Sequence, residues 1–190
     1  MHQALILDKN FKNIDYTTNE LPKAEYDNCT FIDCNFSDSY LTGINFLECE
    51  FIDCNFSSAK VKGVTFNNIV FKNCKLLGLP FYDCNSFLLS MQFIGCQLSL
   101  ASFNNLNLKD SSFRDCKLEK VDFTNVNLST VSFSSCDLNQ AIFNNTNLEK
   151  TDFRSSYNYS FSPENNKIKG AKFLKEEVLG LLKSYNIIIE

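Results

Sequence analysis

Residues 29–36 read Cys-Thr-Phe-Ile-Asp-Cys-Asn-Phe, and residues 49–56 read Cys-Glu-Phe-Ile-Asp-Cys-Asn-Phe. Seven of these eight positions are identical, although the two stretches begin twenty residues apart. Near-identity at a fixed interval is typical of a repeat protein, in which each repeat buries its apolar side chains against the next. The stretch therefore predicts a chain built from stacked units of twenty residues.

A finer period lies inside each unit, because every fifth residue is large and apolar, as in Phe31, Phe36, Leu41 and Phe46. Five matches neither the helical period of 3.6 nor the strand period of 2. If four units of five make one square turn, residues twenty apart share a column, and successive turns lie about 4.8 Å apart. One such column, with a single step of twenty-two residues, forms the predicted core ladder: Phe11, Phe31, Phe51, Phe71, Phe93, Phe113, Phe133, Phe153 and Phe173.

The residue two positions before each central one is usually small, and most of the nine cysteines stand there. A narrow four-sided tube has room for one large and one small inward side chain on each side. We interpret the cysteines as reduced, packed thiols, since free cysteine is a small and buryable residue. Zinc or disulfides are the alternatives, but a straight column does not supply ligands that converge tetrahedrally. No metal site is therefore expected.

The pattern of a small residue, any residue, a central Leu or Phe and two variable positions closely resembles the pentapeptide-repeat family. The match covers residues 26–81 and 88–155. The resemblance implies an all-β solenoid, a right-handed quadrilateral β-helix, for residues 1–173. Residues 1–25 keep the phase but lack most of the small residues, and they are expected to be a degenerate coil that caps the N-terminal end.

Residues 82–92 shift the phase by two positions, so either Ser86 or Leu88 is expected to take the central slot. The insertion is either a bulge at a corner or a protruding loop. A loop on a rigid scaffold is a common place for recognition. In that second interpretation Asp83, Phe87 and Leu88 would contact a partner.

Residues 174–190 are expected to leave the solenoid. The spacing of apolar residues predicts a short helix over 174–184, and a short strand is expected at Ile187, Ile188 and Ile189. Both would close the open C-terminal end. The apolar residues exceed what a cap needs, which predicts a homodimer through Val178, Leu181, Leu182, Tyr185, Ile187, Ile188 and Ile189.

The C-terminal end also resembles that of the quinolone-resistance (Qnr-like) subgroup of the family. The matching residues are Gly170, Phe173, Leu181, Leu182 and Ile187 to Ile189. This resemblance implies a rod that mimics DNA and modulates a type II topoisomerase, DNA gyrase, with protection against quinolones. The other hypothesis, favoured slightly, is a non-catalytic protein-interaction scaffold with a different partner, since a fold does not fix function.

The formal net charge of −4 and the pI of about 5.1 disfavour direct nucleic-acid binding. The start of the chain does not read as a signal peptide, and no apolar run reaches the length of a membrane span. A cytoplasmic protein without membrane contact is expected. The sequence has one histidine, His2, and no phosphate loop or nucleophile motif, so neither a cofactor nor an enzymatic activity is expected.

Overall fold

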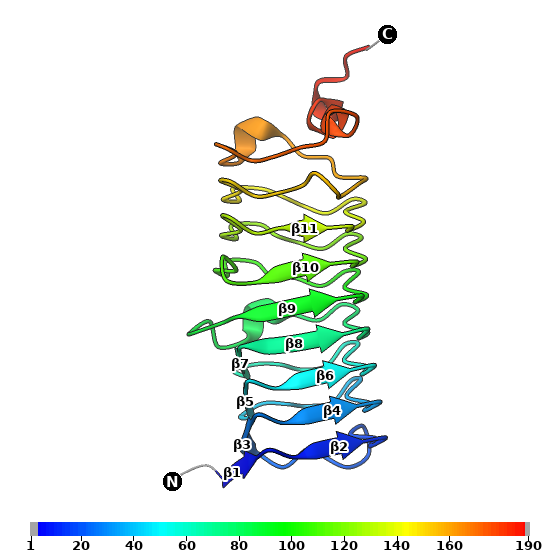
Figure 1. Cartoon of the computed structure of the whole chain (residues 1–190), viewed down its shortest axis with the longest axis vertical. Coiled ribbons are helices and arrows are strands. Elements are labelled where there is room, and N and C mark those ends of the chain that lie inside the picture. Colours follow the sequence, from blue (N-terminus) through cyan, green and yellow to red (C-terminus); the bar gives the residue numbers. More distant parts are fainter. Residues whose placement is uncertain (1–3, 189–190) are drawn as a thin grey trace.

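The computed structural model describes residues 4–188 and is a rod of stacked, four-sided coils (Figure 1). Its regular elements are short, because each side of a coil holds only one pentapeptide. Their bounds are β1 Ala4–Leu7, β2 Asn10–Lys12, β3 Ala24–Asp27, β4 Thr30–Ile32, β5 Asn45–Leu47, β6 Glu50–Ile52, β7 Thr65–Asn67, β8 Ile69–Lys72, η1 Phe81–Asp83, β9 Met91–Ile94, β10 Ser112–Arg114, β11 Phe133–Ser134, η2 Pro163–Asn165, η3 Val178–Leu181 and η4 Lys183–Tyr185.

Two parallel sheets run along adjacent sides of the rod, in the orders β1-β3-β5-β7 and β2-β4-β6-β8-β9-β10-β11. The register is twenty residues, as in Phe31 opposite Phe51. At the phase break it becomes twenty-two, and Phe71 lies opposite Phe93. Isolated parallel bridges such as Asp15 to Asn35 and Ser102 to Asp122 hold the other two sides. The expected square solenoid is therefore confirmed.

The interior is filled by the aromatic column. Adjacent members of the nine-phenylalanine ladder stack with ring centroids 4.7–5.4 Å apart and interplanar angles of at most 16°. Rings on neighbouring sides meet edge to face, as Phe51 and Phe56 do at 5.0 Å. The seven inner members are at most 1% exposed, whereas Phe11 and Phe173 at the two ends are partly exposed. Stacked and edge-to-face contacts are the preferred aromatic geometries.

The small inward residues close the space between coils. All nine cysteines are free and buried. The Cys54 thiol, for example, donates to the carbonyl of Phe31 in the preceding coil at 3.4 Å. Later in the chain, the hydroxyls of Thr146 and Ser156 donate to carbonyls of the preceding coil in the same way, at 2.8 and 2.6 Å. This common bond explains why cysteine, threonine and serine replace one another at this position.

The C-terminal segment departs from the expectation. The described residues after 173 form no α-helix; they form turns followed by the 3₁₀ segments η3 and η4. The strand expected at 187–189 is wrong for Ile187 and Ile188, which are irregular, and Ile189 lies outside the described residues. No helix within residues 4–188 has the length and apolar character needed to cross a bilayer.

Candidate interaction surfaces

The insertion at 82–92 forms a knob beside the rod, and both of its ends are anchored. On the N-terminal side, the Asp83 carbonyl accepts a hydrogen bond from the amide of Gly63 at 2.7 Å. Asn85 pairs with Thr65, its side-chain amide donates to the Thr65 hydroxyl at 3.2 Å, and its Oδ1 accepts from the Phe87 amide at 3.1 Å. These bonds fix the direction in which the chain leaves the rod.

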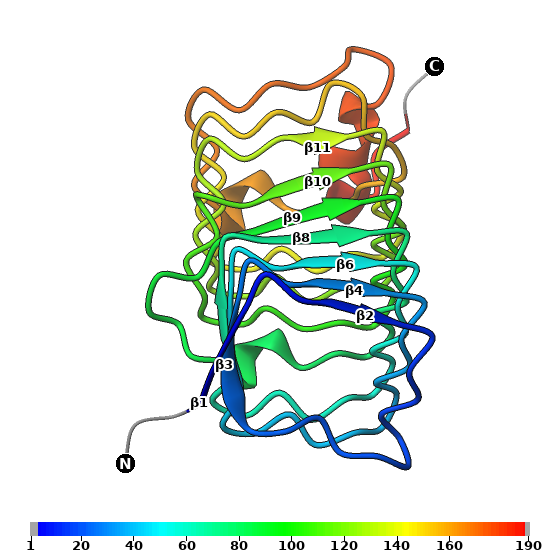
Figure 2. The same cartoon turned by 60° about the horizontal axis from the view of Figure 1, so that its bottom comes forward.

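On the C-terminal side, the Ser90 hydroxyl donates to the Asp110 carbonyl at 3.1 Å, and the Met91 amide donates to the Ser111 hydroxyl at 3.2 Å. Leu89 and Met91 are buried in the core, 6% and 0% exposed. The insertion is therefore held by coils on either side of it along the rod, as in the green loop that leaves the rod near β9 in Figure 2.

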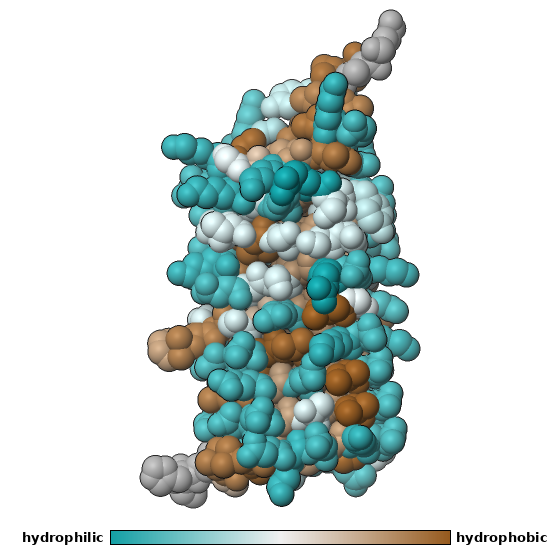
Figure 3. Space-filling view, in the orientation of Figure 1, coloured by the Kyte–Doolittle hydropathy of each residue, from teal (hydrophilic) through white to brown (hydrophobic). Residues whose placement is uncertain are grey.

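The tip of the knob is apolar and exposed. Phe87 and Leu88 are 71% and 61% exposed, and Leu88 adopts a left-handed backbone conformation with φ of 55°. Figure 3 shows brown atoms protruding on the side where Figure 1 shows this loop. Asp83 is also exposed, so the three residues singled out in the sequence all face solvent.

The sequence did not identify two features of the knob. Neither Ser86 nor Leu88 takes the central slot, because both are exposed and Leu89 turns inward instead. Tyr82, 50% exposed, adds a further aromatic side chain beside Asp83. The neighbouring Leu88 and Leu89 are chemically alike, so only the path of the backbone decides which one is buried.

The N-terminal third of the rod is acidic. Residues 1–60 contain ten Asp or Glu and four Lys or Arg, a net charge of −6, whereas the remainder carries +2. Asp33 and Asp53 occupy the same corner of successive coils, since Ile32 and Ile52 are paired. Glu50 is neutralised in part by an ion pair with Lys72. The negative charge is concentrated at one end of the rod.

The C-terminal segment packs on the last coil and closes it. Gly180 and Leu181 are buried, and Val178 is packed against the core. A Cβ atom on Gly180 would lie 2.0 Å from the carbonyl oxygen of Tyr159, so only glycine permits this approach. Tyr159 itself is 2% exposed and contacts the ring of Phe173. Val178 and Leu181, expected in a dimer interface, are therefore used within the chain.

The rest of the expected dimer residues remain accessible. Tyr185, Ile187 and Ile188 are 45%, 56% and 87% exposed. Leu182 and Ile187 line a hollow of about 170 Å³ on the outside of the cap, together with Leu179 and Lys183. Ile189 lies outside the described residues. Leu174 and Leu179, which the sequence did not assign to the dimer interface, extend the exposed apolar surface.

A hollow of about 460 Å³ lies near the last coils. Asn158, which has a left-handed backbone conformation, is part of its lining, and the next residue, Tyr159, is buried. No carboxylate or thiol lines it. Its lining consists of Asn139, Gln140, Ala141, Ile142, Phe143, Asn158, Ser160, Phe161 and Lys183.

Two of the buried thiols, Cys49 and Cys84, are chemically quiet. Burial raises the pKa of Cys49 to about 12, and it raises the pKa of Cys84 as well. A thiol that stays protonated at neutral pH is a poor nucleophile and a poor metal ligand. Among residues 4–188 no group of three or more His, Cys, Asp or Glu side chains could hold a metal ion.

Two family models match the chain. The model described as pentapeptide repeats (8 copies) matches residues 29–68 and 49–85, and the model described as pentapeptide repeat region matches residues 86–160. The two matches follow one another without a gap and together cover most of the rod. They include the phase break as well as the regular coils.

The chain is similar to solved structures at low sequence identity. A trypsin-treated form of QnrB1, a plasmid-mediated fluoroquinolone resistance protein, is 18% identical with a TM-score of 0.56; the match covers 100% of this chain and 99% of that one. HetL, a pentapeptide repeat protein involved in heterocyst differentiation regulation in the cyanobacterium Nostoc sp. strain PCC 7120, is 16% identical with a TM-score of 0.46, covering 90% and 86%. No curated protein matches the chain in sequence.

Proposed function

Because the chain belongs to the pentapeptide-repeat family, we propose that it is a rigid, non-catalytic scaffold that binds another protein. The observation that carries this proposal is the anchored knob with its exposed Phe87 and Leu88. Aromatic anchors are typical of binding hot spots, and a preorganised support favours binding because little conformational entropy is lost. A protein partner fits better than nucleic acid, given the net charge of −4.

Capture of binding partners by three bait proteins tests the scaffold proposal. Bait proteins are the wild type, a variant with Phe87→Ser and Leu88→Ser, and a control with Tyr40→Ser, which removes another exposed aromatic ring, 72% exposed, away from the knob. A partner of the knob is recovered with the wild type and the control and is lost with the double variant. The same recovery with all three baits rules out the knob as the binding site.

A second candidate is modulation of DNA gyrase by mimicry of DNA. It is supported by the acidic N-terminal coils, whose carboxylates would meet a basic groove that normally holds phosphates. The fluoroquinolone resistance named for QnrB1 concerns that protein, and the shared fold brings it to this chain only as a hypothesis.

Supercoiling assays with and without a fluoroquinolone test this candidate. The wild type should inhibit supercoiling or relieve inhibition by the drug. Asp33→Asn with Asp53→Asn should weaken the effect, whereas Asp115→Asn, at the equivalent corner of a later coil, should not. If the wild type leaves gyrase and its inhibition unchanged, this candidate fails and the scaffold proposal stands.

We also propose that two copies pair through the exposed part of the C-terminal cap, at Leu182, Tyr185, Ile187 and Ile188. The reducing cytoplasm is the proposed location, since all nine cysteines are unpaired thiols.

Sedimentation velocity on a variant with Ile187→Lys and Ile188→Lys tests the pairing through the cap. A variant that associates as the wild type does rules this interface out.

A further inference from the structure

The N-terminal end of the rod is an open edge of both sheets. Among the described residues, β1 pairs only with β3, and β2 only with β4. In the second coil, the amides of Thr30 and Asn35 donate to Lys9 and Ile14 of the first coil, at 2.9 Å each. By the twenty-residue repeat, the equivalent amides of Asn10 and Asp15 face out of the end of the rod.

The first of these edge strands is apolar on both faces. Leu5 and Leu7 point outward and are 56% and 45% exposed, and inward Ile6 is partly exposed. One coil further in, the positions of Leu5 and Leu7 are taken by Glu25 and Asp27. Proteins usually protect edge strands with Lys, Pro or a bulge, because an exposed apolar edge pairs with another strand. β1, with the sequence Ala-Leu-Ile-Leu, has none of these.

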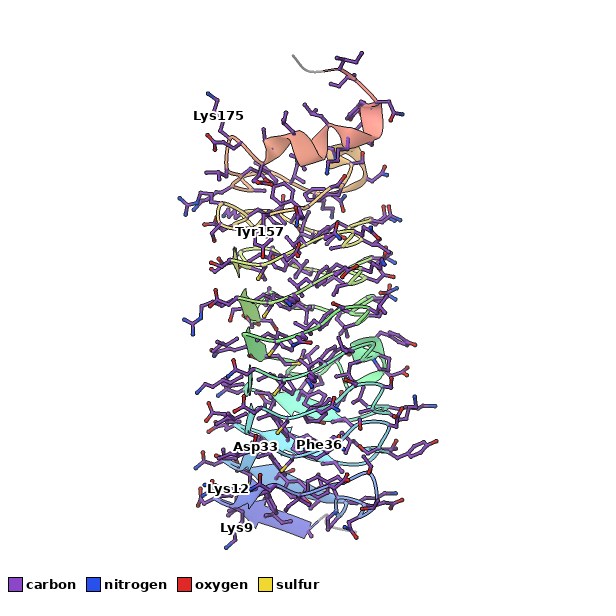
Figure 4. All side chains as sticks on the ribbon, turned by 90° about the vertical axis from the view of Figure 1, so that its right-hand side faces the viewer. Lys9, Lys12, Asp33, Phe36, Tyr157 and Lys175 are labelled. Atoms are coloured by element: carbon purple, nitrogen blue, oxygen red, sulfur yellow. The ribbon has the colours of Figure 1, made fainter. Side chains whose placement is uncertain are left out.

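The charge of the first coil differs from that of its neighbours. Residues 4–23 hold three acidic side chains (Asp8, Asp15 and Glu20) and three basic ones (Lys9, Lys12 and Lys23), so this coil is neutral. Residues 24–60 hold seven acidic side chains and one lysine. Figure 4 shows Lys9 and Lys12 at the end of the rod opposite Lys175. The surface that complements an apolar, neutral edge is another edge of the same kind.

We propose that two copies of this chain associate head to head, with β1 of one copy pairing antiparallel with β1 of the other. A two-fold axis through Ile6 would place Leu5 opposite Leu7 of the partner subunit, and Ile6 opposite its own copy. Apolar cross-strand pairs of this kind stabilise a sheet. The pairing is isologous and therefore closes at two copies when the cap interface is not engaged.

The four-sided outline of the rod predicts a second contact between the two copies, made by residues outside β1. The two-fold axis passes through the middle of the side that contains β1. It therefore places the side that contains β2 in one copy against the side that contains Glu20 in the other copy. The chains run antiparallel there, so Lys12 would lie opposite Glu20 of the partner subunit. Opposite charges in register favour this arrangement, and like charges would disfavour it.

Sedimentation velocity on the full chain tests the proposal in two series of variants. One series keeps the cap, and the other carries Ile187→Lys and Ile188→Lys to remove the cap interface. In both series Leu5→Lys with Leu7→Lys should weaken association about tenfold or more, because two charges then face an apolar edge. Leu47→Lys is the matched control, since it adds a charge in the column of Leu7 two coils away from the edge. In the series with the altered cap, any remaining association comes from the β1 pairing, so the two pairings are tested separately.

A charge exchange tests the geometry. Lys12→Glu and Glu20→Lys should each weaken association, and the chain carrying both changes should recover it. A cap-altered chain that stays monomeric, or an unchanged association in the Leu5 and Leu7 variant, overturns the proposal. Circular dichroism of each variant confirms that the fold is retained.

Discussion

At the scale of single residues, the five-residue period depends on a left-handed backbone position that recurs in most units. The residue two after the centre has positive φ, as in Asp33 (51°), Asp53 (54°) and Gly43 (80°). Glycine, Asn and Asp adopt this conformation at little cost, whereas other L-residues lose about 1–2 kcal/mol there. The chain turns at these residues, which stand at most of the four corners of a coil.

Leu100 is an unfavourable residue at such a corner. It has φ of 64° and is 63% exposed, so its side chain gains little from burial. We expect Leu100→Asn to raise the free energy of unfolding by about 0.5–1 kcal/mol, since Asn tolerates the left-handed region. Chemical denaturation measures the difference. Leu77→Asn, an exposed leucine without positive φ, is the control and should not gain stability; an equal gain for both would contradict the explanation.

Phe113 tests the contribution of one ring in the ladder. It is 1% exposed and stacks between Phe93 and Phe133, at 5.0 Å from each. Phe113→Ala should lower the free energy of unfolding by about 3–5 kcal/mol, from lost burial and the cavity that remains. Ile142→Ala, 47% exposed, should change it by about 0.5 kcal/mol or less. A loss below about 1 kcal/mol for Phe113→Ala would be inconsistent with a buried ladder.

The buried Cys49 thiol makes stability depend on pH. The pKa of Cys49 is raised by burial from 9.0 to about 12, so between these values the folded chain holds a proton that the unfolded chain releases. The stability that this thiol contributes is therefore fully present below pH 9, and it is lost as pH rises from 9 toward 12. Tyr26, raised by burial from 10.0 to about 12, acts in the same direction. Cys49→Ala should reduce the fall of the free energy of unfolding with pH, as measured by urea titrations above pH 9. If the fall is unchanged in this variant, groups other than Cys49 cause it.

At the scale of elements, the sequence predicts regular coils well and irregular segments poorly. The register of Phe31 on Phe51 follows from the repeat, because each coil repeats the environment of the one before. Asparagine side chains twenty residues apart bond in the same way, since Asn125 donates to Asn105 and Asn127 donates to Asn107. The insertion and the cap have no such template. In those segments the choice between Leu88 and Leu89, or between an α-helix and 3₁₀ turns, depends on contacts that are not local in sequence.

The cap is docked through Gly180, whose close contact with the Tyr159 backbone leaves no room for a methyl group. Gly180→Ala should therefore separate the cap from the last coil while the rod remains folded. Limited proteolysis with trypsin reports this, because Lys175 and Lys183 flank the contact. We expect faster cleavage at these lysines than in the wild type or in Ser184→Ala, an exposed control. Equal cleavage rates in all three chains would show that the cap is held by other contacts.

At the scale of the whole molecule, the rod has two unlike ends and one lateral feature. The N-terminal end is a neutral coil with an apolar edge, followed by acidic coils. The C-terminal end is closed by the cap, and the knob leaves the side near β9. The sequence predicted the knob residues as a hypothesis, since the phase break is visible in the spacing of Phe71 and Phe93. It did not predict the open apolar edge, because Leu5 and Leu7 look like ordinary strand residues until their neighbours are known.

The central claim is that residues twenty apart lie on adjacent coils. Spin labels attached to cysteines introduced at Arg114 and Ser134 test it most directly, because these outward positions are paired in β10 and β11 and the native thiols are buried. We predict strong dipolar broadening, from a Cα separation of about 5 Å, and little broadening for Arg114 with Thr124, half a coil away. Absence of broadening at 114 and 134, as in a helix that separates them by about 30 Å, would contradict the account.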